Sequence, residues 1–187
     1  GIEIVPRPRT DQNALKHGGI IMQYGDEIPN VMLLGDSHAL MWSPIIDEIS
    51  RELNITTSFY GMDAHFPFIH SYTDLGKAIR KWKPLIILAV RWSWSWRHDE
   101  QAQQLIEFIE ENDAEILLIQ QPPELYFGDK NTPQYLSFKG IKPQGAKDVF
   151  IRTGNDEEYA KGDAAVRKLS TRYAHCHSVG IRNLFLN

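Results

Sequence analysis

Short apolar runs that alternate with helical patterns constrain the fold of this chain more than any other feature. The clearest runs are residues 31–34, 85–90 and 115–120. Runs of this length without alternating polar residues are typical of strands that are buried on both faces of a parallel sheet. A β-rich stretch at 55–60 and a short run at 182–186 complete the set of predicted strands.

Helical patterns lie between these runs. Apolar side chains recur at helical spacing over 40–53, and further helices are predicted over 73–82, 99–112 and 155–176. This alternation predicts an α/β fold, namely a three-layer αβα, doubly wound (flavodoxin-like) parallel sheet of about five strands. The crossovers between its strands should be right-handed.

The chain of 187 residues is long enough for one domain with a proper core. Residues 1–24 contain prolines and a glycine pair that interrupt any period, so they are interpreted as an irregular N-terminal arm or linker. Residues 25–187 are predicted to form the α/β domain. Within it, 122–152 has weak periodicity and several prolines and aromatics, which indicates an insertion over the strand ends and a candidate lid.

Composition excludes several classes of protein. The formal net charge of −4 gives no basic stripe of the kind that a general nucleic-acid binder needs. No apolar run reaches the length of a transmembrane helix. The single cysteine, Cys176, cannot form an internal disulfide and excludes a zinc site of the CxxC type. We expect no metal and no cofactor. Cys176 is either a small buried apolar residue or paired outside this sequence.

The sequence Gly35-Asp36-Ser37-His38 directly follows the first predicted strand and opens a helix. In an open parallel sheet, ligands bind outside the carboxyl ends of the strands. A helix N-terminus also presents free backbone N–H groups, which suit the oxyanion of acyl transfer. These features favour Ser37 as a nucleophile. The alternative is that Asp36 or Ser37 only caps the helix.

This segment, with its strand before and its helix after, resembles the first sequence block of the SGNH (GDSL-like) hydrolase superfamily. The Gly-Asp-Ser-His form followed by Ala39 is most similar to SGNH domains associated with membrane acyltransferases that O-acetylate bacterial surface polysaccharides. The resemblance covers about 30–187 in element order, but only this block matches sharply. It implies that Ser37 is the catalytic nucleophile, with Gly35, Asp36 and His38 as motif residues.

The resemblance also implies the other parts of an oxyanion site and a substrate site. Gly61 follows the second strand, where the family places an oxyanion glycine, and its alternative role is a turn glycine. Arg91 lies where many members carry an asparagine, so it is a candidate oxyanion donor or a structural ion-pair residue. Trp92 and Trp94 are expected to stack on sugar rings unless they pack in the core. His65 belongs to a segment that resembles a Cys-Pro-Pro-like stretch of these domains, and is a further candidate for substrate binding.

The family's catalytic base, an Asp-x-x-His pair after the last strand, is not found in this sequence. We expect it beyond Asn187. Substitution by His65 or His70 is less favoured, and His38 should diverge from the nucleophile because it is adjacent to Ser37 on a helix. A metal site at His175 and His177 is disfavoured because alternate residues on a helix point apart.

The sequence is compatible with three functions to different degrees. The favoured one is serine-dependent O-acyl transfer or ester hydrolysis on a carbohydrate, through an acyl-enzyme on Ser37. The second is a catalytically incomplete SGNH-fold domain that binds carbohydrate or serves as an accessory module. The third, a flavodoxin-like nucleotide or receiver domain, is disfavoured because no further glycine follows Gly35 in the turn. The resemblance implies an acylated glycan as substrate, a membrane acyltransferase domain as partner, and an extracytoplasmic location.

Overall fold

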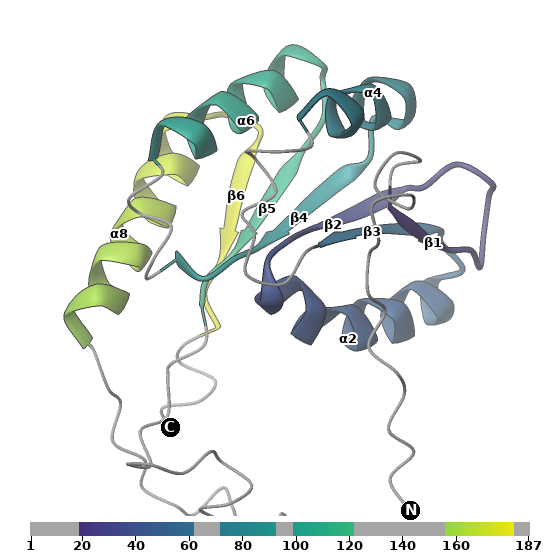
Figure 1. Cartoon of the computed structure of the whole chain (residues 1–187), viewed down its shortest axis with the longest axis horizontal. Coiled ribbons are helices and arrows are strands. Elements are labelled where there is room, and N and C mark those ends of the chain that lie inside the picture. The colour runs from purple at the N-terminus through teal and green to yellow at the C-terminus, as the bar shows by residue number, and fades with distance from the viewer. Residues whose placement is uncertain (1–18, 62–71, 93–98, 122–155, 182–187) are drawn as a thin grey trace, which may run out of the picture.

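A six-stranded sheet forms the centre of the computed structural model, which describes residues 19–61, 72–92, 99–121 and 156–181. The strand order is β1-β3-β2-β4-β5-β6 (Figure 1). The strands are β1 (Ile20–Met22), β2 (Val31–Gly35), β3 (Thr57–Gly61), β4 (Leu85–Ala89), β5 (Ile116–Ile119) and β6 (Cys176–Val179). The helices are α2 (Ser37–Leu53), α4 (Tyr72–Trp82), α6 (Asp99–Glu111) and α8 (Asp156–Arg172). No helix within the described ranges is both long and apolar enough to span a bilayer.

Strands β2 to β6 pair in parallel, which confirms the predicted α/β fold with a doubly wound sheet. The first strand differs from the prediction. β1 pairs antiparallel with β3, with Ile20 opposite Phe59, so the expected irregular arm over 1–24 is wrong for its last residues. An edge strand of three residues is too short to show a period. Gly19 precedes it at a φ of +101°, where an added Cβ would lie 2.2 Å from the Phe59 carbonyl oxygen.

The two faces of the sheet are covered unequally. In Figure 1, α4, α6 and α8 lie along one side and α2 lies on the other. The face toward α4, α6 and α8 packs the larger core cluster, which includes Leu34, Leu88 and Leu118. The smaller cluster includes Leu33, Phe59 and Ile87 and lies against α2. Because in-register residues of neighbouring strands point to the same side, each cluster runs across several strands.

On the α2 side, only part of the sheet is covered by a described helix. Leu88, which faces α4, α6 and α8, is 0% exposed, whereas Leu85 of the same strand faces the α2 side and is 38% exposed. Val179 of β6 also remains exposed on this face. α2 packs mainly on β2 and β3 and less on β4, so among the described residues the β4–β6 half of this face has less apolar burial.

Local side chains explain how α2 tolerates a proline and where it ends. Pro44 lies inside the helix and has no N–H to donate to the Leu40 carbonyl. The Ser43 hydroxyl donates to that carbonyl instead, at 3.0 Å, and Ser43 is itself buried. The helix ends at Asn54, which adopts the left-handed conformation with φ 53° and ψ 46°.

The C-terminal part of the prediction is also corrected. The helix expected to reach residue 176 ends at Arg172, and residues 176–179 form β6. β6 was missed because only its first residue is buried, so the strand shows no apolar run. The strand predicted at 182–186 lies outside the described residues, as does the insertion predicted at 122–152.

The unequal covering of the two faces predicts different costs for the same substitution within one strand. Leu88→Ala should lower the free energy of unfolding by about 2–5 kcal/mol, because it empties a fully buried site. Leu85→Ala should lower it by less than about 1 kcal/mol, since that side chain stays partly in water. Urea unfolding followed by tryptophan fluorescence measures both. Equal losses would contradict the unequal covering.

Candidate functional site

The carboxyl ends of five strands are level with one another. Gly35 of β2 lies opposite Gly61 of β3 and Ala89 of β4. Ala89 lies opposite Ile119 of β5, which lies opposite Val179 of β6. The residues that follow these strands therefore gather along one edge of the sheet, which is where ligands bind in open α/β folds.

Gly35 lets β2 and β4 approach closely just before the predicted nucleophile. A Cβ added at this position would lie 1.8 Å from the Ala89 carbonyl oxygen and 2.8 Å from the Ala39 Cβ. No side chain fits there without separating β4 and α2 from β2. The glycine of the motif is therefore required by packing, whatever chemistry follows it.

Ser37 is the first residue of α2 and is half-buried. The first intrahelical bond runs from the Leu40 N–H to the Asp36 carbonyl at 3.3 Å, so the Ser37 N–H precedes the helical ladder. Asp36 caps the helix, because its side chain accepts the His38 N–H at 2.8 Å. The capping alternative is thus correct for Asp36, and it leaves Ser37 available for another role. No hydrogen bond joins the Ser37 hydroxyl to another residue in the described ranges.

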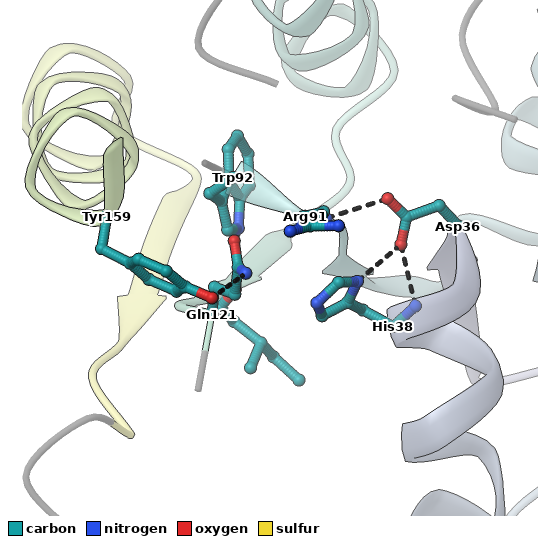
Figure 2. Close-up of polar contacts among 7 residues, drawn as sticks. Asp36, His38, Arg91, Trp92, Gln121 and Tyr159 are labelled. Atoms are coloured by element: carbon teal, nitrogen blue, oxygen red, sulfur yellow. Dashed lines mark hydrogen bonds and ion pairs between the residues drawn. The ribbon is translucent and has the colours of Figure 1, made fainter. Parts of the chain in front are cut away.

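The Asp36 carboxylate is a buried centre of hydrogen bonds, drawn in Figure 2. Its Oδ1 accepts from the His38 backbone N–H and from the His38 ring at Nδ1, 3.0 Å away. Its Oδ2 accepts the Arg91 backbone N–H at 2.9 Å. Burial alone raises the pKa of Asp36, but the hydrogen bonds from the His38 ring, Arg91 N–H and His38 N–H outweigh it. The pKa of this carboxyl therefore lies below its ordinary value, and the group is an anion at neutral pH.

The structure places Gly61 and Arg91 on the two strands that flank β2. Gly61 ends β3 directly beside Gly35, and an added Cβ would lie 3.3 Å from the Gly35 carbonyl oxygen. Arg91 follows β4 and is half-buried. The three segments that were predicted to build an oxyanion site are thus neighbours. The His38 ring is hydrogen-bonded to Asp36, and its divergence from Ser37 stays a prediction.

Trp92 is not a sugar-stacking residue in this structure, so that prediction is corrected. The side chain is 1% exposed, lies in the larger core cluster and donates from Nε1 to the Ile119 carbonyl at 2.7 Å. The alternative, core packing, holds because the indole N–H finds a buried acceptor on β5. The other two predicted substrate residues, Trp94 and His65, lie outside the described residues, as does His70.

Gln121 and Tyr159 lie near the same edge and were missed from the sequence. Gln121 follows β5, and its Nε2 donates to the Tyr159 hydroxyl of α8 at 3.0 Å, with both side chains buried (Figure 2). The position of Gln121 right after a predicted strand was an available signal. Tyr159 carried none, because its role depends on how α8 packs against the sheet.

His175 and His177 lie at the opposite, amino edge of the sheet. The sequence predicts that they point apart on a helix. Instead, His175 directly precedes β6 and His177 lies within it, and alternate side chains along a strand point to the same side of the sheet. Glu115 bridges them, with one oxygen 2.8 Å from His175 Nδ1 and the other 2.8 Å from His177 Nε2. Within the described residues no group suited to a metal ion is found. Cys176 is a free, buried thiol, and burial raises its pKa to about 12.

A comparison with protein families decides the identity of this fold. The model described as "SGNH domain (fused to AT3 domains)" matches residues 9–187. The chain belongs to this family. The resemblance inferred from the Gly-Asp-Ser-His motif is therefore confirmed, and the level strand ends belong to an SGNH domain.

Solved structures share the SGNH fold of this chain at low sequence identity. The periplasmic domain of a lipopolysaccharide acetyltransferase from Salmonella ser. Paratyphi A is 16% identical, with a TM-score of 0.65. The alignment covers 96% of this chain and 75% of that one. A putative acylhydrolase from Bacteroides fragilis is 12% identical, with a TM-score of 0.50 and coverages of 96% and 73%. A comparison with curated proteins finds no match.

The contact of Gly35 with β4 predicts that Gly35→Ala is severely disruptive. The added methyl should lower the free energy of unfolding by roughly 2 kcal/mol or more, because backbone atoms of Ala89 must move. Gly180→Ala is the matched control at the same edge, since its nearest neighbour is the Gln120 side-chain oxygen at 3.1 Å, which can turn aside. Thermal unfolding of the two variants measures the difference. A harmless Gly35→Ala would contradict the close approach.

The Glu115 bridge predicts a pH dependence that Glu115→Gln removes. The hydrogen bond with Glu115 raises the pKa of His175, so its contribution to stability is complete below 6.5 and is lost as the pH rises through the folded value. The bonds from His175 and His177 lower the pKa of Glu115, so its contribution is present above 4.5 and is lost as the pH falls.

NMR titration of His175 should therefore show a raised pKa in the wild type and a lower one in Glu115→Gln. The charge-matched control is Glu111→Gln at the end of α6, which should leave the His175 titration unchanged. An unshifted His175 in the wild type would show that the bridge does not persist in solution.

Proposed function

We propose that this SGNH domain carries out serine-dependent O-acyl transfer or ester hydrolysis on a carbohydrate, with Ser37 as the nucleophile. One observation supports this most directly: Ser37 is the first residue of α2, immediately beyond the level ends of β2, β3 and β4. At this position its hydroxyl and its backbone N–H lie on the edge where Gly61 and Arg91 also lie. An acyl carbonyl held there meets a nucleophile and backbone donors together.

The proposed chemistry has two halves. The Ser37 oxygen attacks the acyl carbonyl carbon while a base takes its proton, and the tetrahedral oxyanion is stabilised by the N–H groups of Ser37 and Gly61 and by Arg91. The bond to the donor oxygen then breaks as the base returns the proton to the leaving group. A sugar hydroxyl next attacks the acyl-enzyme through the same base, which releases the acylated sugar and restores Ser37. Water as acceptor gives hydrolysis instead.

The base is assigned to a histidine outside the described residues, of the kind that the family's Asp-x-x-His pair provides. His38 is less suitable because it neighbours Ser37 on the same helical turn, so its side chain should diverge from the Ser37 hydroxyl. His175 and His177 lie at the opposite edge of the sheet and are bonded to Glu115. Ser37 alone would be a weak nucleophile at neutral pH.

The setting of this activity is inferred from the family description and from a matched structure. Its members are described as fused to AT3 domains, and the matched Salmonella structure is a periplasmic domain of a lipopolysaccharide acetyltransferase. By analogy we propose an acylated glycan or polysaccharide as substrate, a membrane acyltransferase domain as partner, and an extracytoplasmic location. Fold-level analogy supplies the substrate class, whereas the position of Ser37 supplies the reaction type.

The role of Ser37 predicts how the full-length protein responds to a fluorophosphonate, which reacts only with activated serines. The wild type should be labelled on the peptide that contains Ser37, and Ser37→Ala should not be labelled at all. Ser43→Ala is the matched control, because Ser43 lies in the same helix but is buried and donates to the Leu40 carbonyl. It should keep the wild-type labelling rate with a small loss of stability.

The alternative function, a catalytically incomplete domain that binds carbohydrate, predicts a different result. This alternative is retained because, within the described ranges, no base is hydrogen-bonded to the Ser37 hydroxyl. In that case the wild type and Ser37→Ala would be equally unreactive, yet both would retain binding to an acylated glycan in calorimetry.

A further inference from the structure

Asp36 does more than cap a helix. We propose that it is a positioning residue that holds the Ser37 turn and the Arg91 segment together, so that both face the same acyl carbonyl. This role rests on the proposed function of Ser37. It assigns to Asp36 a part in the rate of acyl transfer without any contact with the substrate.

The carboxylate joins two segments that are far apart in sequence. Asp36 and Arg91 are separated by 55 positions, and their link is the Arg91 N–H donating to Oδ2 at 2.9 Å. The pairing of β2 with β4 ends at Gly35 and Ala89. Beyond that pair the two strands diverge. β2 leads into α2, and β4 leads into the segment that begins with Val90. The Asp36 side chain therefore makes the next connection after the last rung of the sheet.

Two of the three proposed oxyanion donors, Ser37 and Arg91, depend on this connection. The N–H of Ser37 is set by the first turn of α2, whose cap is the Asp36 Oδ1. Arg91 is set by the path of its own backbone, which the Asp36 Oδ2 holds. One rigid carboxylate thus fixes the spacing of two donor groups, and oxyanion stabilisation depends steeply on such spacing.

The position requires an anion rather than an amide. Three N–H donors converge on the two oxygens, namely the His38 backbone, the His38 ring and the Arg91 backbone. A carboxylate accepts all three, whereas asparagine offers one oxygen and one NH2 group. Because the site is buried, an NH2 group set against the Arg91 N–H would leave both donors unsatisfied. The three donors also offset the negative charge, which would otherwise oppose the oxyanion nearby.

The test uses Asp36→Asn in the full-length protein. The variant keeps an oxygen for the two His38 donors, so the helix cap survives, while the link to Arg91 is lost. We expect kcat for hydrolysis of a small acetyl ester to fall about a hundredfold, with KM within about twofold. Rates are expressed per active site, counted by fluorophosphonate titration, so that a smaller folded fraction does not mimic the effect.

Asp47→Asn is the matched control. Asp47 lies on the same helix and accepts the Tyr24 hydroxyl at 2.7 Å and Arg51 at 3.0 Å, remote from the strand ends that carry the site. It should lower the melting temperature slightly and leave kcat unchanged. Wild-type kcat in Asp36→Asn would overturn the positioning role alone. Absence of Ser37-dependent turnover in the wild type would overturn both this role and the proposed function.

A measurement on the wild type covers the case in which Asp36→Asn does not fold. Hydrogen exchange followed by NMR should show the Arg91 amide protected to a degree similar to the ladder amides of β4, although it lies beyond the last paired residue. Exchange of the Arg91 amide at the rate of an open loop would overturn the proposal, since the hydrogen bond between the Arg91 N–H and Asp36 would then be broken most of the time.

Discussion

The close approach of β2 to β4 at Gly35 and Ala89 is the constraint on which the rest of the site depends. It brings the ends of the parallel strands level, and it allows α2 to start directly beyond the sheet. Of the residues that the proposed chemistry uses, Ser37 and Arg91 follow the ends of β2 and β4, and Gly61 ends β3 beside Gly35. The hydrogen bond from the Arg91 N–H to the Asp36 carboxylate then joins the two segments beyond the last backbone pair. The carboxyl edge is therefore organised by packing first and by hydrogen bonds second.

The two edges of the sheet carry different polar residues, and its two faces are covered by different helices. The carboxyl edge carries Ser37, Asp36 and Arg91, whereas the amino edge carries the Glu115 bridge to two histidines, with half-exposed side chains. One face is buried beneath α4, α6 and α8, and the other is covered among the described residues mainly over β2 and β3. The larger cluster lies on the face away from α2, and Ser37 belongs to neither cluster.

Sequence patterns were sufficient for the central strands and for the motif, since buried parallel strands show as apolar runs and Gly35 ends the first of them. They failed for β1 and β6, because edge strands with one covered face carry no such run. They also failed for Trp92, whose exposure depends on whether the Ile119 carbonyl lies within reach of its indole N–H. The hydrogen bond from the Arg91 N–H to Asp36 could not be predicted for a similar reason, as it joins residues 55 positions apart.

Trapping the acyl-enzyme tests the central claim most directly. Full-length protein would be mixed with an activated acetyl ester, quenched in acid within its first turnovers, digested and analysed by mass spectrometry. The account predicts one acetyl group on the peptide that contains Ser37, located by fragmentation to the Ser37 oxygen and absent from Ser37→Ala. An acetyl group on another residue, or turnover of the ester with Ser37 unmodified in both proteins, would contradict Ser37 as the nucleophile of this SGNH domain.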